Sequence, residues 1–394
     1  MIIKPRIRGF ICTTAHPRGC AAHVQQQIDY VKRSGVIDAG VKNALVIGCS
    51  GGYGLASRVV AGFGCGANTL GLSFEKSPSV KKTATAGWYN NAAFEEAAAA
   101  EGLYAKTLDG DAFSDEMKAA VVRTLTEEVG RIDLLIYSLA SPVRRHPRTG
   151  VLHRSAIKPL GKAVRMKSLN VDKGQVHEIA LEPGDADDIA NTVAVMGGED
   201  WQFWIEALRG ADLLAPSFRT LAFTYLGSEL TWPIYWQGTL GKAKEDLDCA
   251  ATEITAQLVD LDGSARVASL KGVVTQASSA IPVVSLYMSL LFRVMKDQGL
   301  HEDCVQHIYR LYATQLARGA EPRLDASGRI RVDDVELSDP VQGEIKRRWP
   351  IVTSDNLSEL GDLDGYKADF LKIFGFGLPG VDYDEDVDPC LGRI

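Results

Sequence analysis

Short apolar runs alternate with helical patterns along most of this chain, and this rhythm constrains the fold more than any other feature of the sequence. Such alternation is typical of a parallel β-sheet covered by helices, because parallel strands need a long crossover connection between them. We expect buried strands at residues 44–47, 69–74, 104–108, 132–139, 221–225 and 267–275, and helices at residues 54–63, 92–101, 115–129 and 242–258. The sequence therefore predicts the α/β class, with a Rossmann-type, doubly wound parallel sheet.

Three stretches do not follow this rhythm, and we interpret them as additions to one Rossmann-type catalytic unit spanning residues 1–394. Residues 1–41 precede the first strand and form an N-terminal extension. Residues 142–198 are basic and loop-rich, and we expect them to form an insertion near the active site. Residues 300–394 combine helical patterns with an irregular acidic end, which indicates a C-terminal helical extension.

The composition excludes several classes of protein. The chain has 394 residues, 46% of them hydrophobic and 24% charged, so it can bury a core without disulfides. A net charge of -7 disfavours a nucleic-acid partner. The 7 cysteines include no C-x-x-C pair, and the 7 histidines form neither H-x₃-H nor H-E-x-x-H. We therefore predict neither a disulfide framework nor a metal site.

Residues 272–292 carry no charge, and their length alone would suit a membrane-spanning helix. They also contain Gln276, four serines and Pro282, which favour a different interpretation. We expect a buried strand followed by a buried helix that begins near Pro282. The N-terminus has no continuous apolar stretch of the kind found in signal peptides, so we predict no membrane association and a cytoplasmic location.

A glycine-rich turn, GCSGGYG, follows the first expected strand at residues 48–54. Its glycines at 48, 52 and 54 match the G-x-x-x-G-x-G spacing of short-chain dehydrogenase-like folds. Glycine allows the chain to turn sharply and to approach a pyrophosphate closely. The N-terminus of the helix that follows offers free N–H groups and a positive dipole end to the phosphates. The turn therefore predicts a dinucleotide site.

Glu75 ends the second expected strand, 21 residues after Gly54. A carboxylate there can accept hydrogen bonds from the adenosine ribose and would repel a 2′-phosphate, which favours NADH over NADPH. Two observations keep other interpretations open. Glu75 is also compatible with a simple polar strand end, and the adjacent Lys76 could attract a 2′-phosphate.

Tyr235 and Lys244 have a Y-x₈-K spacing. Reductases of this general fold use a tyrosine as an acid and a lysine to hold the nicotinamide ribose, and short-chain dehydrogenases space the two as Y-x₃-K. Nine positions along one straight helix would put the two side chains on opposite faces. Because Pro233, Gly238 and Gly241 lie in the same segment, we predict that Tyr235 precedes a helix and Lys244 lies inside it.

Several longer stretches resemble one family almost from end to end. They are GFICTTAHPRGC from Gly9, GWYN from Gly87, DAFSDE from Asp111, IDLLIYSLASPVR from Ile132, MGGEDW from Met196, AFTYLG from Ala222, VVTQASSAIPVVSLY from Val273 and GYKADFLKIFGFG from Gly365. The chain resembles the FabV-type enoyl-acyl carrier protein reductases and the related trans-2-enoyl-CoA reductases. One departure is the glycine turn, where GCSGGYG replaces the usual GASTGYG and Gly51 lacks a hydroxyl.

The resemblance implies a set of roles for residues of this chain. It implies that Tyr235 is the catalytic acid, that Lys244 binds the cofactor and that Tyr225 contacts the substrate. It implies NADH as cofactor, enoyl-acyl carrier protein or enoyl-CoA as substrate, and a monomer. The residues it places around NADH are Gly48, Cys49, Ser50, Gly51, Gly52, Tyr53, Phe74, Glu75, Asp111, Ala112, Leu139, Ala140, Lys244, Val273, Val274 and Thr275.

The implied reaction is hydride transfer from NADH to the β-carbon of a trans-2-enoyl thioester, the last step of fatty-acid elongation. Tyr235, with Tyr225 as a second candidate, would donate a hydrogen bond to the thioester oxygen as it becomes negative. The sequence does not identify the source of the α-carbon proton. Two alternatives are a carbonyl reductase of the short-chain type, acting on ketoacyl substrates, and a non-catalytic protein that senses NAD.

Two further segments suggest contacts with the substrate. Residues 281–292 are apolar and predict either one wall of an acyl tunnel or a plain core helix. No acidic residue lies between Asp133 and Asp172, and we interpret the basic residues of this span as a surface for an acidic carrier protein or for coenzyme A phosphates. A solvated basic face is the alternative. These basic residues are Arg144, Arg145, Arg148, Arg154, Lys158, Lys162, Arg165 and Lys167.

Overall fold

The computed structural model describes residues 1–8, 11–139, 141–279 and 281–391. Its centre is a parallel sheet of 7 strands in the order β13-β12-β11-β6-β3-β4-β5. This confirms the predicted Rossmann-type fold. The strands are β3 (Asn43–Ile47), β4 (Asn68–Ser73), β5 (Ala105–Asp109), β6 (Ile132–Tyr137), β11 (Leu214–Thr224), β12 (Ser264–Ser269) and β13 (Ile330–Arg331).

The strand order reverses next to β3. From β3 the chain builds outward through β4 and β5, then crosses back to β6 on the other side of β3 and continues through β11 and β12. The carboxyl ends of strands at such a reversal leave a crevice, since their connections depart in opposite directions. This topology therefore places a ligand site beyond Ile47 and Tyr137.

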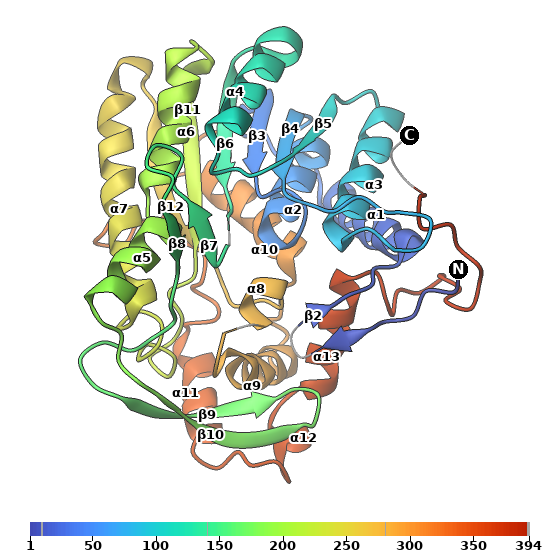
Figure 1. The fold of residues 1–394 in the computed structure, drawn as a ribbon, viewed down its shortest axis with the longest axis vertical. Coiled ribbons are helices and arrows are strands. Elements are labelled where there is room, and N and C mark those ends of the chain that lie inside the picture. Colours follow the sequence, from blue (N-terminus) through green and yellow to red (C-terminus); the bar gives the residue numbers. More distant parts are fainter. Residues whose placement is uncertain (9–10, 140, 280, 392–394) are drawn as a thin grey trace.

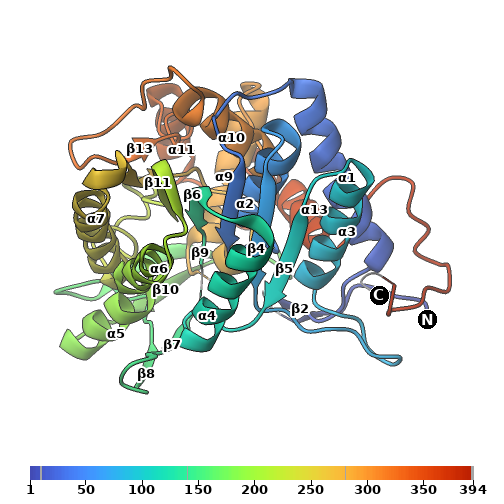
Figure 2. The ribbon, with the colours of Figure 1, turned by 90° about the horizontal axis from the view of Figure 1, so that it is seen from above.

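Helices cover both faces of the sheet (Figure 2). Alternate side chains of a strand point to opposite faces, so Ala44 and Val46 pack into one core cluster and Leu45 and Ile47 into another. The first cluster involves α1 (Pro17–Ser34), α2 (Gly52–Val59), α3 (Ala86–Ala100) and α10 (Cys304–Leu311), and the second involves α4 (Asp115–Thr124), α6 (Glu199–Gly210) and α7 (Thr239–Gln257).

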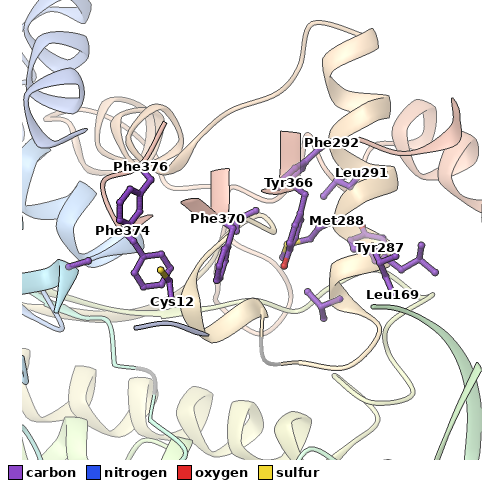
Figure 3. Close-up of a cluster of buried hydrophobic side chains, with 14 of the residues drawn as sticks. Cys12, Leu169, Tyr287, Met288, Leu291, Phe292, Tyr366, Phe370, Phe374 and Phe376 are labelled. Atoms are coloured by element: carbon purple, nitrogen blue, oxygen red, sulfur yellow. The ribbon is translucent and has the colours of Figure 1, made fainter. Parts of the chain in front are cut away.

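A third core cluster lies beyond the sheet, at one end of the molecule (Figure 1). It is centred on α9 (Val284–Asp297), and Figure 3 shows Met288 and Phe292 of this helix with Tyr366 and Phe370 of α13. The elements gathered there are β9 (Val164–Asn170), β10 (Gln175–Leu181), α11 (Asp339–Arg348), α12 (Leu357–Leu360) and α13 (Leu363–Ile373). The insertion and the C-terminal segment thus share one core.

Residues 142–198 are more regular than the loop-rich segment that we expected. They contain two hairpins and a helix, with β7 (Val143–Arg145) paired to β8 (Leu152–Arg154), β9 paired to β10, and α5 (Ala186–Met196). Most side chains of these short strands are at least partly exposed, so the apolar alternation that marks a half-buried strand is weak. The expectation of loops was wrong for this reason.

The last expected strand was predicted too long. β12 ends at Ser269, and residues 270–275 leave the sheet as a loop. Its neighbours end at the same level, because β11 stops at Thr224 and β13 pairs with the last two residues of β12, Ala268 and Ser269. Val273 and Val274 are buried away from the sheet, so their apolar character imitated a continuing strand.

The remaining elements are short. They are β1 (Ile7–Arg8), β2 (Ile11–Cys12), α8 (Gln276–Ser279), π-helical turns at Val60–Gly64, Leu125–Val129 and Tyr312–Leu316, and a 3₁₀ turn at Val259–Leu261. The described residues of the uncharged stretch from Gly272 to Phe292 form the loop, α8, a turn at residues 281–283 and the first part of α9. Within the residues that the structure describes, no helix has the length and apolar character needed to cross a membrane.

Candidate active site

A cavity of about 1920 Å³ opens at the carboxyl ends of the parallel strands. Residues that follow six of the strands line it, which is where the strand order predicts a ligand to bind. One from each is Gly48 after β3, Phe74 after β4, Gly110 after β5, Leu139 after β6, Tyr225 after β11 and Leu270 after β12. Tyr235 and Lys244 line the same cavity.

The glycine turn has two positions that only glycine can fill. A Cβ at Gly48 would lie 2.0 Å from the carbonyl oxygen of Ser138, and a Cβ at Gly54 would lie 1.9 Å from that of Gly48. Gly51, in contrast, has nothing within 4 Å of its missing Cβ. Because Gly51 is also the N-cap of α2, it brings no side chain over the helix N-terminus, which suits a pyrophosphate.

Glu75 is held at the edge of this turn. Its Oε1 accepts a hydrogen bond from the hydroxyl of Ser50 at 2.6 Å. Gly87, in the N-terminal turn of α3, leaves room for the carboxylate, because a Cβ there would lie 2.1 Å from the same oxygen. Phe74 lines the cavity with 80% of its surface exposed, so its ring is free to cover a bound base.

The other expected cofactor residues divide into three groups. Cys49 does not reach the cavity, since its side chain is buried and its thiol faces the Asn91 amide oxygen at 3.5 Å. The place of Cys49 around NADH, which the resemblance implies, stays a prediction for its backbone rather than its side chain. Ala140 lies outside the described residues. The residues that do line the cavity are Gly48, Ser50, Gly51, Gly52, Tyr53, Phe74, Glu75, Asp111, Ala112, Leu139, Lys244, Val273, Val274 and Thr275.

Tyr235 lies before α7 and Lys244 lies inside it, which confirms the arrangement expected from their spacing. The chain turns tightly between them, because a Cβ at Gly241 would lie 1.8 Å from the carbonyl oxygen of Trp236. This turn brings the Lys244 ammonium 5.5 Å from the centre of the Tyr235 ring. The ammonium also donates a hydrogen bond to Thr224 Oγ1 at 2.8 Å.

Burial changes the acidity of both members of the pair. It raises the pKa of Tyr235 well above that of a free tyrosine, so the hydroxyl keeps its proton at neutral pH. It lowers the pKa of Lys244 to about 8, against the opposing influence of Asp248. The site therefore contains a hydrogen-bond donor next to a cation that titrates near neutrality.

Tyr225 packs edge to face against Tyr235, with ring centroids 5.1 Å apart and an interplanar angle of 86°. Its hydroxyl donates a hydrogen bond to Glu336 Oε1 at 2.9 Å. We did not identify Glu336 from the sequence. It lies 111 positions from Tyr225 among other acidic residues, and nothing in its local pattern separates it from them.

The apolar segment at residues 281–292 fits both interpretations offered for it. Ile281, Met288 and Phe292 line the cavity. Leu286 and Leu290 are completely buried in the core cluster around α9. One side of this helix therefore forms a cavity wall, while the rest is core.

The basic residues of the insertion do not form one surface. Arg144 is 1% exposed, forms an ion pair with Glu199 at 2.8 Å and donates to the carbonyl oxygen of Ala194 at 2.6 Å, so it cannot meet a carrier protein. Lys167 donates to three backbone carbonyls of the C-terminal segment. Arg145, Arg154, Lys162 and Arg165 remain exposed, and Arg148 and Lys158 pair with Glu206 and Asp188.

No cluster of three or more histidine, cysteine, aspartate or glutamate side chains placed to hold a metal ion occurs among the described residues.

Known proteins resemble this chain over its whole length. Three family models match, described as the trans-2-enoyl-CoA reductase catalytic region (residues 82–317), the NAD(P)H binding domain of trans-2-enoyl-CoA reductase (residues 2–80) and the enoyl reductase FAD binding domain (residues 324–387). An enoyl-[acyl-carrier-protein] reductase [NADH] of Pseudomonas fluorescens is 56% identical, with 99% of this chain and 98% of that protein covered. One of Opitutus terrae is 53% identical over 100% of both chains.

Solved structures of known proteins also resemble this chain over its whole length. The trans-2-enoyl-CoA reductase of Treponema denticola in complex with NAD is 46% identical, with a TM-score of 0.95 and 100% of both chains covered. That of Clostridium acetobutulicum in complex with NADH is 39% identical, with a TM-score of 0.96 over 100% of this chain and 99% of that one. The chain therefore belongs to the family of enoyl-acyl carrier protein reductases and trans-2-enoyl-CoA reductases.

Proposed function

We propose that this chain reduces the trans-2 double bond of enoyl thioesters with NADH, giving the saturated acyl thioester in the last step of fatty-acid elongation. One observation carries the proposal. The glycine turn, Glu75 and the pair of Tyr235 and Lys244 all line a single cavity at the reversal of the sheet. The family to which the chain belongs supports the same reaction.

The residues of the cavity fit a dinucleotide. The open N-terminus of α2 suits the pyrophosphate, and Glu75, held by Ser50, suits the hydroxyls of the adenosine ribose. Lys244 would hold the nicotinamide ribose. When bound, NADH supplies the hydride that reduces the β-carbon.

Tyr235 stabilises the negative charge that forms on the substrate during reduction. Reduction of the β-carbon moves negative charge to the thioester oxygen, and the protonated hydroxyl of Tyr235 donates a hydrogen bond to that oxygen. A donor of this kind typically contributes ~10²–10³ in rate. The cationic Lys244 beside the ring lowers the free-energy cost of any charge that develops on the tyrosine oxygen. The wall formed by Ile281, Met288 and Phe292 would receive the acyl chain.

Residues 324–387 match a model named for FAD, but their side chains do not fit a flavin. Within the described part of this range, Asp369, Lys372, Ile373 and Phe374 reach the large cavity. Many of the others pack as core, and the single short strand β13 is followed by no glycine-rich turn. We therefore derive no step through a flavin.

Four finer points belong to the same proposal. Either an acyl carrier protein or coenzyme A would carry the substrate, and the chain would act as a cytoplasmic monomer. Residues 1–394 would form one catalytic unit, to which residues 1–41, 142–198 and 300–394 are added. Size-exclusion chromatography with light scattering checks the monomer, because a dimer would double the 42.6 kDa mass of the chain.

The first experiment follows NADH consumption with crotonyl-CoA for the wild type and Tyr235→Phe. We expect turnover by the wild type and a loss of ~10²–10³ in kcat for the variant, with NADH affinity retained. A folded wild type that binds NADH without turnover calls for an enoyl-acyl carrier protein substrate next. Turnover of a 3-ketoacyl thioester instead would favour the carbonyl reductase, and binding without any turnover would favour the sensor.

A further inference from the structure

A buried carboxyl group stands directly behind the active-site tyrosines. Glu336 is fully buried, and its Oε1 accepts hydrogen bonds from the hydroxyls of Tyr225 at 2.9 Å and Tyr287 at 2.8 Å. Its Oε2 accepts the backbone N–H of Gly272 at 2.5 Å. A buried carboxyl group with this many hydrogen-bond partners is an ordered part of the site. Glu336 is connected to the cavity through Tyr225, because Tyr225 lines the cavity.

The direction of the hydrogen bonds distinguishes Tyr287 from Tyr225. Gln342 Nε2 donates to the Tyr287 oxygen at 3.0 Å and to the Glu336 carbonyl oxygen at 2.7 Å. The Tyr287 oxygen is thus occupied as an acceptor, so its single proton points to Glu336 Oε1. The contact between Glu336 Oε1 and the Tyr225 oxygen at 2.9 Å can run in either direction. In the acid form of Glu336, a proton on Oε1 is donated to the Tyr225 oxygen, and the Tyr225 proton then turns to the cavity.

Tyr225 also lies next to the tyrosine that we propose to bind the thioester oxygen. Its ring stands edge to face against Tyr235 in the cavity. The thioester oxygen and the α-carbon are bonded to the same carbonyl carbon, so two neighbouring hydroxyls suit these two atoms. With Tyr235 at the oxygen, Tyr225 is left for the α-carbon.

We propose that Glu336 is a positioning residue that acts through Tyr225, and that the two together supply the proton of the α-carbon. This inference rests on the proposed function. The enolate electron pair forms a C–H bond at the α-carbon while the Tyr225 O–H bond breaks and the thioester carbonyl re-forms. The Glu336 O–H bond then breaks and restores the Tyr225 hydroxyl. The carboxylate that remains is stabilised by Tyr287 and Gly272, and a proton from solvent restores the acid before the next turnover.

The electrostatic surroundings agree with this assignment. Burial raises the pKa of Glu336, which favours the acid form, while the backbone N–H of Gly272 and the charge of Lys271 oppose that shift. The Lys271 ammonium is held by the carbonyl oxygens of Gly272 at 3.1 Å and Glu302 at 2.8 Å. Burial also raises the pKa of Tyr225, so a tyrosinate there regains a proton readily.

Kinetics of Glu336→Gln, Tyr225→Phe and the double variant test the proposal. Glutamine keeps the shape of the side chain but cannot supply the proton, and general acids contribute ~10²–10⁴ in rate. We expect kcat to fall about 10²-fold in each single variant, with KM for crotonyl-CoA and the Kd of NADH within about twofold. The double variant should be no slower than either single variant, because one pathway is lost in each. Tyr312→Phe is the control, since it removes a buried tyrosine hydroxyl that lies outside the cavity, 3.5 Å from the carbonyl oxygen of Ser57, and its kcat should stay within about threefold.

A stereochemical readout is independent of how well Glu336→Gln folds. Reduction is run in D₂O with NADH deuterated at the transferred position, and the relative configuration at the α- and β-carbons is read by NMR. We expect one configuration for the wild type and a mixture for Tyr225→Phe, since solvent would then protonate both faces. A single configuration in Tyr225→Phe overturns the proposal, as does equal loss of kcat and thermal stability in Glu336→Gln and Tyr312→Phe. Failure of the wild type to reduce either enoyl thioester would instead overturn the proposed function.

Discussion

Glu75 and Lys76 are neighbours in the chain with opposite consequences for a 2′-phosphate. Glu75 is half-buried and tied to Ser50, whereas the Lys76 side chain is exposed and its backbone N–H donates to Thr85 Oγ1. Because the carboxylate is the better ordered of the two charges, it should decide cofactor choice.

We therefore predict that Glu75→Ala lowers the preference for NADH over NADPH at least tenfold, since a like charge at this position costs about 1–2 kcal/mol. The ratio of kcat/KM for the two cofactors measures this. Lys76→Ala is the control and should leave the ratio within about twofold. An unchanged ratio in Glu75→Ala would show that its carboxylate does not select the cofactor.

Lys244 gives the reaction a pH dependence. Burial lowers the pKa of its ammonium to about 8, so the cation is present below that pH and is lost as the pH rises through it. We predict that kcat/KM falls above pH 8 with one ionisation, and that Lys244→Arg shifts this fall to higher pH because arginine stays charged. A pH profile of NADH oxidation measures both. The same fall in the arginine variant would assign it to another group.

At the scale of elements, the turn into α2 contains one glycine that no other residue can replace, Gly54, and one that has room for a side chain, Gly51. A side chain at Gly54 would collide with the carbonyl oxygen of Gly48, while Gly51 has open space and an extended backbone with φ of -162°. The two glycines lie three positions apart and therefore form a matched pair for substitution.

We predict that Gly54→Ala weakens NADH binding at least tenfold and lowers the thermal midpoint, because strand β3 and helix α2 must separate. Gly51→Ala should bind NADH within about twofold and gain up to about 1 kcal/mol of stability from the smaller entropy of its unfolded chain. Fluorescence titration and thermal unfolding check both variants. Equal tolerance of alanine at the two positions would contradict the close approach.

The elements differ in how well the sequence predicts them. The strands β3, β4 and β6 are buried on both faces, so their apolar runs locate them to within two residues. α3 begins at Ala86, earlier than expected, since its first turns pack as core without helical periodicity. Hairpins such as β9–β10 are half-exposed and leave no such run.

At the scale of the whole molecule, the active site depends on segments that the Rossmann core does not contain. α9 supplies a cavity wall, and Glu336 comes from the C-terminal segment. The two ends of the chain also meet, since the N-terminal amine donates to the carbonyl oxygen of Val387 at 2.7 Å. Residues near both ends of the chain, among them Cys12 and Phe374, also line the cavity.

This packing leads to a prediction about the segment that matches the FAD-named model. Because its apolar side chains fill a core, we expect the purified protein to contain no flavin absorbance and to reduce crotonyl-CoA at the same rate with or without added FAD. Absorbance spectroscopy of the purified protein and the NADH assay check this. A stoichiometric flavin, or activity that depends on added FAD, would contradict it.

The sequence by itself determined the features that depend on neighbouring residues. The periodic apolar runs specify an α/β sheet, the glycine spacing specifies a tight turn, and the positions of Gly238 and Gly241 keep Tyr235 and Lys244 off one straight helix. Tertiary structure alone decided the rest. The burial of Arg144 against Glu199, the placement of Cys49 beneath the turn and the hydrogen bond from Tyr225 to Glu336 join residues far apart in the chain. Desolvation and charge pairing act through space, so no local pattern in the sequence records them.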